Sequence, residues 1–361
     1  MKMRKMAAFL AVAALVAACG NGEDPAEDTP ETPDSETPTE EPEASADDEV
    51  DEPADDDRAD WPDSLTMTLQ PAENPEALIE DAQVLGDMLS EKLGVEVEAE
   101  VPTDYQAVIV GLQTGQADIG GGFGPVNVAR AMDQAGAEPI LQAERFGEFL
   151  YVTQWFTNDP DTFCADEPVE EIYEADGEEY VMLFCNGVNE LETSEDGPVG
   201  TEMLEHAGDV TISFVSQGSA SGEVFPAFGL IEMGYELDEL DTMYAGGHPE
   251  SVLAVANGDA TIGVSYNDAR EDLVAEIPDI GEQVVVFAWS DPIPNDGFVI
   301  RGDLPQSLKD AVTDALLEIA EDETQGQVLL DLYTIDGFRP ADPADFDVAR
   351  QVDQQLGELL G

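Results

Sequence analysis

Two serines at the start of a predicted helix are the residues best placed to hold a ligand. Ser219, Ala220, Ser221 and Gly222 follow an apolar run that predicts a buried strand, and helically spaced apolar residues continue from them to Gly234. Hydroxyls and unpaired N–H groups at a helix start attract anions, although a serine there is as often a simple helix cap. The Gly-Lys-Ser/Thr of a nucleotide-phosphate loop is absent. We therefore expect neutral donors to hold an anion.

Nucleophilic catalysis is the alternative chemistry for the same serines. A serine nucleophile needs a positioned base, and His248 is the only candidate, since no pattern surrounds His206. The Gly-x-Ser-x-Gly turn of many hydrolases is absent. Tyr105 and Tyr151 suit packing as well as ligand contact. The pattern favours a binding site over an enzyme.

The charge of the chain excludes several classes of partner. Its 82 acidic and 12 basic residues give a formal net charge of −70. A nucleic-acid-binding protein needs a basic surface, and anionic lipid headgroups would be repelled. The composition indicates adaptation to high salt, which screens self-repulsion. Salt also shortens the long-range repulsion of an anionic ligand, so local donors can still capture one.

The N-terminus predicts export. Lys2, Arg4 and Lys5 precede an apolar segment at residues 7–18, which is too short to span a membrane. Small residues directly before Cys19 resemble a bacterial lipobox, in which that cysteine carries a lipid. An ordinary signal peptide with an incidental cysteine is the alternative. We expect a signal peptide at 1–18 and a lipid anchor on Cys19, without a transmembrane helix.

Residues 19–62 are rich in Asp, Glu, Pro and Thr and have little apolar content. Such a composition cannot bury a core and predicts an extended, disordered tether.

Two cysteines remain, Cys164 and Cys185, and in an exported chain they predict one disulfide. No histidine–cysteine cluster surrounds them, so zinc is not expected. The acidic residues 158–200 between the flanking strands predict an irregular surface insertion that the disulfide holds closed.

Strands and helices alternate through the rest of the chain and must position the serines. Runs at 65–69, 95–101 and 117–121 predict strands, and helical spacing predicts helices at 76–93 and 105–112. This order is typical of an α/β domain, whose ligands bind at the carboxyl ends of parallel strands. The loops after Leu69, Gly121 and Val215 are of that kind.

The length of 361 residues allows two lobes. Apolar, aromatic runs at 149–157 and 284–289 predict two crossings between them. We expect a first lobe of residues 63–155 and 287–361, and a second lobe of residues 156–286.

Several segments together resemble a known family. They are Pro71–Pro75, Asp104–Ala107, Gly115–Ile119 with Phe123–Pro125, Ser219–Gly222 with Phe225-Pro226, Gly247-His248 with Ser251–Val255 and Asn257-Gly258, and Ile293-Pro294. With them, roughly residues 64–345 look like the substrate-binding proteins of phosphonate, phosphite and phosphate ABC transporters. The resemblance implies the two-lobed type II periplasmic-binding fold, in which each lobe is a mostly parallel sheet flanked by helices and the ligand lies in the cleft between lobes.

The resemblance also implies a set of ligand contacts. An oxyanion would accept hydroxyl bonds from Ser219 and Ser221, backbone N–H bonds from Ala220, Ser221 and Gly222, and a ring N–H bond from His248. Tyr105, Phe123 and Gly124 would face it from the other lobe, and the loop Tyr266, Asn267, Asp268 would accept from a protonated oxygen or amine. Two positions depart from the family pattern: Ala220 lacks the middle hydroxyl of Ser-Thr-Ser, and Phe123 replaces a tyrosine of some members.

The function implied is that of a monomeric, lipid-anchored receptor outside the cell membrane. It would bind a phosphonate-, phosphite- or phosphate-type anion and deliver it to an ABC permease, with no catalysis, cofactor or metal. Three alternatives stay open: a receptor for a sulfonate or another small anion, a lipoprotein that has lost its transporter, and a secreted serine hydrolase.

Overall fold

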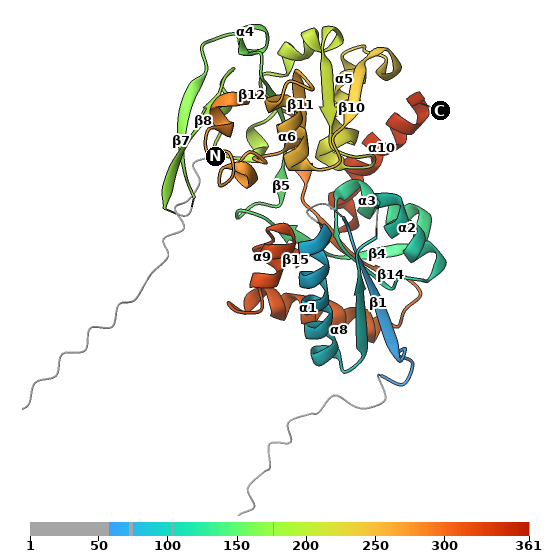
Figure 1. The fold of residues 1–361 in the computed structure, drawn as a ribbon. Helices are drawn as coiled ribbons and strands as arrows, with labels where there is room; N and C mark the ends of the chain where they lie inside the picture. The colour runs from blue at the N-terminus through green and yellow to red at the C-terminus, as the bar shows by residue number, and fades with distance from the viewer. Residues whose placement is uncertain (1–57, 72–74, 103, 176, 361) are drawn as a thin grey trace, which may run out of the picture. The chain divides into compact units, whose positions relative to one another are not determined.

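The computed structural model describes residues 58–71, 75–102, 104–175 and 177–360. The expected signal peptide at 1–18, the lipid site at Cys19 and the tether up to residue 57 lie outside the described residues. The described chain folds around two large sheets, which lie in the lower and upper halves of the ribbon in Figure 1. None of its helices in the described ranges is long and apolar enough to cross a membrane.

The first sheet has six strands in the order β15-β4-β14-β3-β1-β2. Its members are β1 (Ser64–Leu69), β2 (Glu96–Glu100), β3 (Ile119–Phe123), β4 (Ala137–Glu144), β14 (Gly297–Arg301) and β15 (Gly337–Pro340). Strand β1 pairs in parallel with β2 and β3. Strands β14 and β15 arrive late in the chain and pair antiparallel with their neighbours, so the sheet is mixed.

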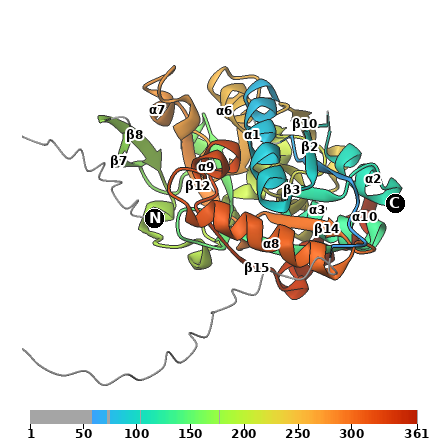
Figure 2. The same cartoon turned by 90° about the horizontal axis from the view of Figure 1, so that it is seen from below.

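Helices cover both faces of this sheet. One face packs against α1 (Pro75–Leu93), α8 (Gln306–Glu321) and α9 (Gln327–Tyr333), which lie together in both views (Figure 1, Figure 2). The other face packs against α2 (Tyr105–Thr114) and α3 (Pro125–Arg130). Helix α2 starts at Tyr105 because the Asp104 carboxylate caps it, accepting a 2.8 Å bond from the Ala107 N–H. This cap fixes Tyr105 at the first position of the helix.

The second sheet has seven strands in the order β10-β9-β11-β6-β12-β8-β7. They are β6 (Thr153–Thr157), β7 (Val169–Ala175), β8 (Glu178–Phe184), β9 (Thr211–Phe214), β10 (Asp241–Tyr244), β11 (Ile262–Tyr266) and β12 (Val285–Trp289). The accompanying helices are α4 (Pro160–Phe163), α5 (Phe225–Glu232), α6 (His248–Ala256) and α7 (Ile280–Gln283). This sheet is also mixed, because β6 runs antiparallel to both β11 and β12.

The chain passes between the sheets in two adjacent segments. Short strands β5 (Leu150–Tyr151) and β13 (Ile293–Pro294) pair with each other at the crossing. Strand β12 ends at Trp289 within the second sheet, so the expected lobe boundary at residues 286–287 falls inside a strand and the return to the first sheet begins later. Helix α10 (Asp347–Leu360) packs against both α3 and α5, and so belongs to neither half alone.

Residues 158–200 differ from the irregular insertion that their acidity predicts. Strand β8 pairs in parallel with β12, and β7 extends the sheet as its edge strand. Tyr180, Met182 and Phe184 alternate on the buried face of β8, which anchors the hairpin to the core. Acidic side chains are tolerated because they occupy the exposed positions of the two strands.

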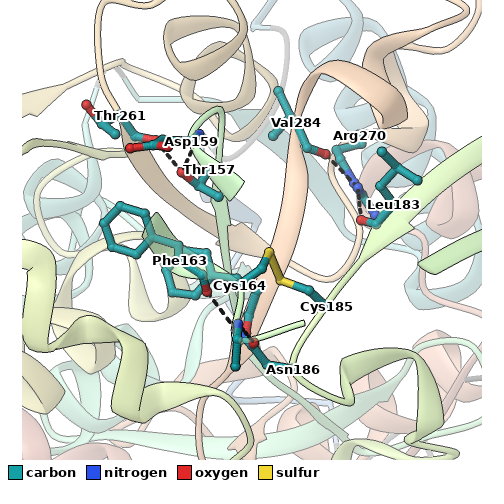
Figure 3. The surroundings of a disulfide bond; sticks show 12 residues. Thr157, Asp159, Phe163, Cys164, Leu183, Cys185, Asn186, Thr261, Arg270 and Val284 are labelled. Atoms are coloured by element: carbon teal, nitrogen blue, oxygen red, sulfur yellow. Dashed lines mark hydrogen bonds between the residues drawn. A yellow bond between two sulfur atoms is a disulfide. The ribbon is translucent and has the colours of Figure 1, made fainter. Parts of the chain in front are cut away.

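The disulfide expected between Cys164 and Cys185 is present and ties this hairpin to helix α4 (Figure 3). The two Cα atoms lie 5.6 Å apart, and Cys185 is only 2% exposed. Beside it the Asn186 amide donates to the Phe163 carbonyl oxygen at 2.8 Å, as Figure 3 shows, and to the Phe287 carbonyl oxygen at 2.9 Å. The disulfide therefore joins core segments and does not merely close a surface loop.

Candidate ligand-binding site

A small cavity of about 40 Å³ lies where the two halves of the fold meet. Its walls come from strand ends and helix starts of both sheets: Gln70, Tyr105, Gly124, Arg145, Tyr151, Ser219, Ala220, Ser221, His248, Tyr266, Asp296 and Tyr333. Seven of the eleven predicted ligand residues are in this set. Carboxyl ends of strands are where α/β sheets place their ligands, so the location agrees with the loops singled out in the sequence.

The serine-rich loop supplies one wall. Ser219 is 3% exposed and Ser221 is 2% exposed, and a single π-helical turn (Ala220–Val224) leads from them into α5. Ser219 Oγ accepts a bond from the Gly222 N–H at 3.2 Å, and Ser221 hydrogen-bonds the Tyr151 hydroxyl. Among the described residues, no hydrogen bond uses the N–H groups of Ala220 and Ser221. These two donors can therefore serve an anion in the cavity.

Other side chains hold this loop in place. Thr153 Oγ1 donates to the Ser221 carbonyl oxygen at 3.1 Å. The Glu223 carboxylate accepts from both the Gly218 N–H and the Tyr244 hydroxyl. Thr153, Glu223 and Tyr244 do not line the cavity, so these bonds support the loop from outside it.

His248 begins α6 and is 6% exposed. Its Nδ1 lies 2.8 Å from Ser265 Oγ, and its ring centroid lies 4.6 Å from that of Tyr266. Burial, together with the positive charge of Arg145, lowers the pKa of His248 to about 3. The ring is therefore neutral at ordinary pH and offers one N–H.

The first half supplies both polar and rigid parts of the cavity. The Gln70 Oε1 accepts from the Gly124 N–H at 3.1 Å and from Asn127 Nδ2 at 2.7 Å. Tyr333 donates to the Gln70 carbonyl at 2.7 Å. Its ring lies so close to Gly122, whose φ is +63°, that a Cβ there would come within 2.3 Å of it. The glycine run of β3 thus makes room for Tyr333.

The cavity is also lined by two charged residues that the sequence analysis did not predict, Arg145 and Asp296. The Arg145 guanidinium, which is 13% exposed, lies 3.7 Å from the Asp296 carboxylate. Burial raises the pKa of Asp296, and Arg145 partly counteracts this. The cavity lining therefore contains a guanidinium in addition to the neutral donors that the sequence predicts. Asp296 follows the Ile293-Pro294 segment closely, which was the available signal for it, whereas no local pattern marks Arg145.

Four of the predicted ligand residues lie outside the cavity. Phe123 is fully buried in the core against the first sheet, and Gly222 packs against Val215. Asn267 lines a neighbouring cavity of about 20 Å³, where its Oδ1 accepts from the Val152 N–H at 3.3 Å. Phe123, Gly222 and Asn267 therefore do not line the cavity of Ser219 and Ser221.

The fourth residue, Asp268, has a different partner. Its two carboxylate oxygens pair with the Arg270 guanidinium, at 3.0 Å from Nε and 2.6 Å from Nη2. Arg270 is fully buried and also donates to the carbonyl oxygens of Leu183 and Val284, as Figure 3 shows. Asp268 therefore supplies the negative charge that a guanidinium buried at this depth requires.

Neither Ser219 nor Ser221 is paired with a base, and Ser265, which is, is fully buried and lines neither cavity. His248 faces Ser265, whereas Ser219 bonds Gly222 and Ser221 bonds Tyr151. A serine hydrolase needs an accessible serine within hydrogen-bond reach of a base, and the cavity does not supply one among the described residues. Among the described residues there is also no group of three or more His, Cys, Asp or Glu side chains that could hold a metal ion.

Comparisons with known proteins identify the family of the chain. A family model described as the periplasmic substrate-binding protein of phosphonate ABC transporters matches residues 67–346. The phosphate-import protein PhnD of Mycolicibacterium smegmatis is 24% identical over 309 residues, which cover 81% of this chain and 85% of the relative.

Solved structures share the fold. A binding protein component of an ABC phosphonate transporter from Pseudomonas aeruginosa aligns with a TM-score of 0.63 and 20% identity, over 82% of this chain and 87% of that chain. PhnD1 from Prochlorococcus marinus, in complex with methylphosphonate, aligns with a TM-score of 0.63 and 17% identity, over 82% of this chain and 98% of that chain. The fold is the type II periplasmic-binding fold. The chain belongs to the family of periplasmic substrate-binding proteins of phosphonate ABC transporters, a family of transport proteins and not of enzymes.

Proposed function

We propose that this protein is a lipid-anchored receptor that captures a small phosphorus oxyanion between its two halves and delivers it to an ABC permease. The observation that carries the proposal is one cavity in which Ser219, Ser221 and His248 from one half face Tyr105 and Arg145 from the other. The M. smegmatis relative is named for phosphate import and the P. marinus structure holds methylphosphonate, and both names support this class of ligand.

The donors suit an oxyanion in a strongly acidic protein. The hydroxyls of the serine loop, two backbone N–H groups and the neutral His248 ring would each donate to a phosphoryl oxygen, and Arg145 would add a charge-assisted bond. These contacts act at hydrogen-bond range, where burial strengthens them, whereas the surface charge acts at long range and is screened by salt. Local attraction therefore outweighs the overall repulsion.

Asp296 would act as an acceptor in the same cavity. An ionised carboxylate can only accept hydrogen bonds, so it favours a ligand oxygen that carries a proton, as in hydrogen phosphate or a monoprotonated phosphonate. This is the acceptor role that we first expected of the loop at residues 266–268. Since Asp268 is paired with Arg270, the role passes to Asp296.

Ligand binding would favour a closed arrangement of the two halves. The chain passes from one sheet to the other near the paired strands β5 and β13, which suits a hinge, and helix α10, which packs against both halves, contacts β13 there. A ligand that contacts both halves binds the closed state better, and this differential affinity shifts the population. The permease would then recognise the closed receptor, which acts as a monomer.

The anchor rests on the sequence alone. A lipid on Cys19 would hold the receptor at the outer face of the cell membrane, and residues 20–57 would let the folded part reach the permease. Replacing Cys19 with serine should move the protein from the membrane fraction to the soluble extracytoplasmic fraction. Retention of the variant in the membrane fraction would contradict the anchor.

Thermal unfolding with added anions tests the ligand class. A ligand at a hundred times its Kd stabilises the native state by about 2.7 kcal/mol, which raises Tm by several degrees. We expect phosphate, phosphite or methylphosphonate to raise Tm, and the Ser219→Ala/Ser221→Ala variant to lose the shift. A shift with methanesulfonate and with none of the three phosphorus compounds would replace the proposal by a sulfonate receptor.

A further inference from the structure

We propose that Arg145 excludes ligands with a positively charged substituent, so that the receptor takes compact anions such as phosphate, phosphite or methylphosphonate and rejects aminoalkylphosphonates. This inference rests on the proposed function, since it concerns the same cavity. It assigns the choice among phosphorus compounds to one side chain.

The guanidinium of Arg145 is fixed in position. Its Nε and Nη2 donate to Thr334 Oγ1 at 3.0 and 2.6 Å, and its Nη1 is directed at Asp296, 3.7 Å away. Its Cζ lies 5.4 Å from the centroid of the Tyr266 ring. The backbone is also held, because Arg145 and Glu148 exchange N–H···O bonds of 2.9 and 3.0 Å. A side chain with this many partners stays at the cavity wall instead of moving into solvent.

Arg145 is the only lysine or arginine among the described residues that line either of the two neighbouring cavities. Asp296 is the only carboxylate among the described residues that line the cavity of about 40 Å³. Its charge is compensated by the Arg145 guanidinium 3.7 Å away, although its oxygens can still accept a hydrogen bond from a ligand hydroxyl. An ammonium group entering here would meet a fixed cation without an uncompensated carboxylate, so electrostatic repulsion would oppose it. A second negative charge on the ligand would be favoured for the same reason.

The small size of the cavity also disfavours an aminoalkyl chain. The cavity of about 40 Å³ is separated from its neighbour of about 20 Å³ by a wall of Arg145, Tyr151 and Tyr266, which line both. Tyr266 is itself held between the Arg145 guanidinium and the His248 ring. By the same measure one water needs about 10–15 Å³, so the first cavity has room for a few water-sized groups. An aminoalkyl chain would have to displace the wall.

Calorimetric titration separates the effect of charge from the effect of size. The ligands are phosphate, methylphosphonate, ethylphosphonate and 2-aminoethylphosphonate, where the last two differ by a terminal ammonium group. For the wild-type protein we expect 2-aminoethylphosphonate to bind at least tenfold more weakly than ethylphosphonate. In Arg145→Gln this ratio should fall to threefold or less, and phosphate should bind at least tenfold more weakly than to the wild type.

Two further variants make the result specific. Arg145→Lys keeps a positive charge at the site and should retain the discrimination between ethylphosphonate and 2-aminoethylphosphonate. Arg339→Gln is the matched control, because Arg339 lies over the Phe149 ring and lines neither cavity. It should bind every ligand as the wild type does.

The outcomes distinguish this inference from the function beneath it. If the wild type binds 2-aminoethylphosphonate as tightly as ethylphosphonate, or if Arg145→Gln keeps the full ratio, the selectivity inference is overturned while the receptor function stands. If the wild type binds phosphate or methylphosphonate but neither two-carbon compound, size alone excludes them and the role of the Arg145 charge is overturned. If the wild type binds none of the four compounds, the proposed function itself fails. Because the ratio is measured on the wild type, the test does not depend on the folding of a variant.

Discussion

The Arg145 guanidinium and the Asp296 carboxylate lie 3.7 Å apart in the wall of one cavity, each only 13% exposed. They come from the two chain segments that lie next to the crossings between the sheets. A cation and an acceptor therefore stand side by side in a site that otherwise consists of hydroxyls, an imidazole and backbone N–H groups. On the proposed function, this pairing would favour oxyanions that are both negative and able to donate a proton.

The first prediction concerns the acceptor. Asp296→Asn replaces a group that can only accept by one that also donates, and it leaves the Arg145 charge without its neighbour. Anions without a proton should gain affinity, and we expect sulfate or methanesulfonate to bind at least tenfold more tightly to the variant than to the wild type. Calorimetry measures both. Equal sulfate affinities for the two proteins would contradict the acceptor role.

The second prediction concerns the serine loop. Ser221→Ala removes one hydroxyl donor and should weaken oxyanion binding by more than about 1 kcal/mol, or roughly fivefold in Kd. Ser251→Ala is the matched control, since Ser251 is fully buried and bonds Ser213 outside the cavity. The control should lose stability and keep its affinity. An unchanged Kd for Ser221→Ala would mean that the loop only caps its helix.

The third prediction concerns the protonation of His248. Burial and Arg145 lower its pKa to about 3, so the folded state favours the neutral ring. The resulting stability is present above the ordinary histidine pKa of about 6.5 and is lost as the pH falls towards 3. NMR of histidine-labelled protein, assigned with His248→Gln, should show no titration of this ring between pH 5 and 8. A midpoint near 6.5 would show that the ring is not buried as described.

The fourth prediction concerns Glu271, away from the cavity. Burial, with Asp268 and Asp272 nearby, raises the pKa of Glu271 to about 8, and Arg270 offsets this in part. A carboxyl with a raised folded pKa costs stability as the pH rises from its unfolded value of about 4.5 through about 8.

Glu271→Gln removes this cost. The variant should match the wild type near pH 4 and exceed it by on the order of 2 kcal/mol above pH 8, in denaturant unfolding at each pH. Glu276→Gln, at an exposed position on the same segment, is the control for the loss of one negative charge. The same gain from both substitutions would assign the effect to net charge and not to the environment of Glu271.

The fifth prediction concerns the disulfide. It closes a sequence separation of 21 residues, and a loop of this size contributes about 3 kcal/mol of stability. Cys164→Ala/Cys185→Ala should therefore lower Tm by several degrees and leave ligand affinity unchanged, because neither cysteine lines the cavity. A reductant should lower the Tm of the wild type and not that of the variant. Free thiols at both positions in the wild type, found by mass spectrometry, would refute the pairing.

Much of the fold could be predicted because local patterns report local structure. The alternation of Leu65, Met67 and Leu69 gives β1, and the cap at Asp104 with Gly115 at the other end gives α2. The β7–β8 hairpin was not predicted because glutamates dominate the composition of this segment. The alternation of Tyr180, Met182 and Phe184 was the signal that could have identified its buried face.

The site could be predicted only in part, for a physical reason. Ser219, Ser221 and His248 lie at the starts of helices, so the neighbouring residues could predict their place in the cavity wall. Arg145 and Asp296 follow or precede strands of a mixed sheet, and only the tertiary fold brings them to the same cavity. Phe123 is the converse case. It is next to Gly124, which lines the cavity, but the side chain of Phe123 is buried in the core.

The central claim is that the cavity of Ser219, Ser221, His248 and Arg145 captures a compact phosphorus oxyanion. Calorimetric titration of the purified wild-type protein with phosphate, phosphite, methylphosphonate and methanesulfonate tests it most directly. The account predicts saturable binding of one molecule per protein for at least one of the three phosphorus compounds, and much weaker binding of methanesulfonate. No binding of any phosphorus compound, or tighter binding of methanesulfonate, would contradict it.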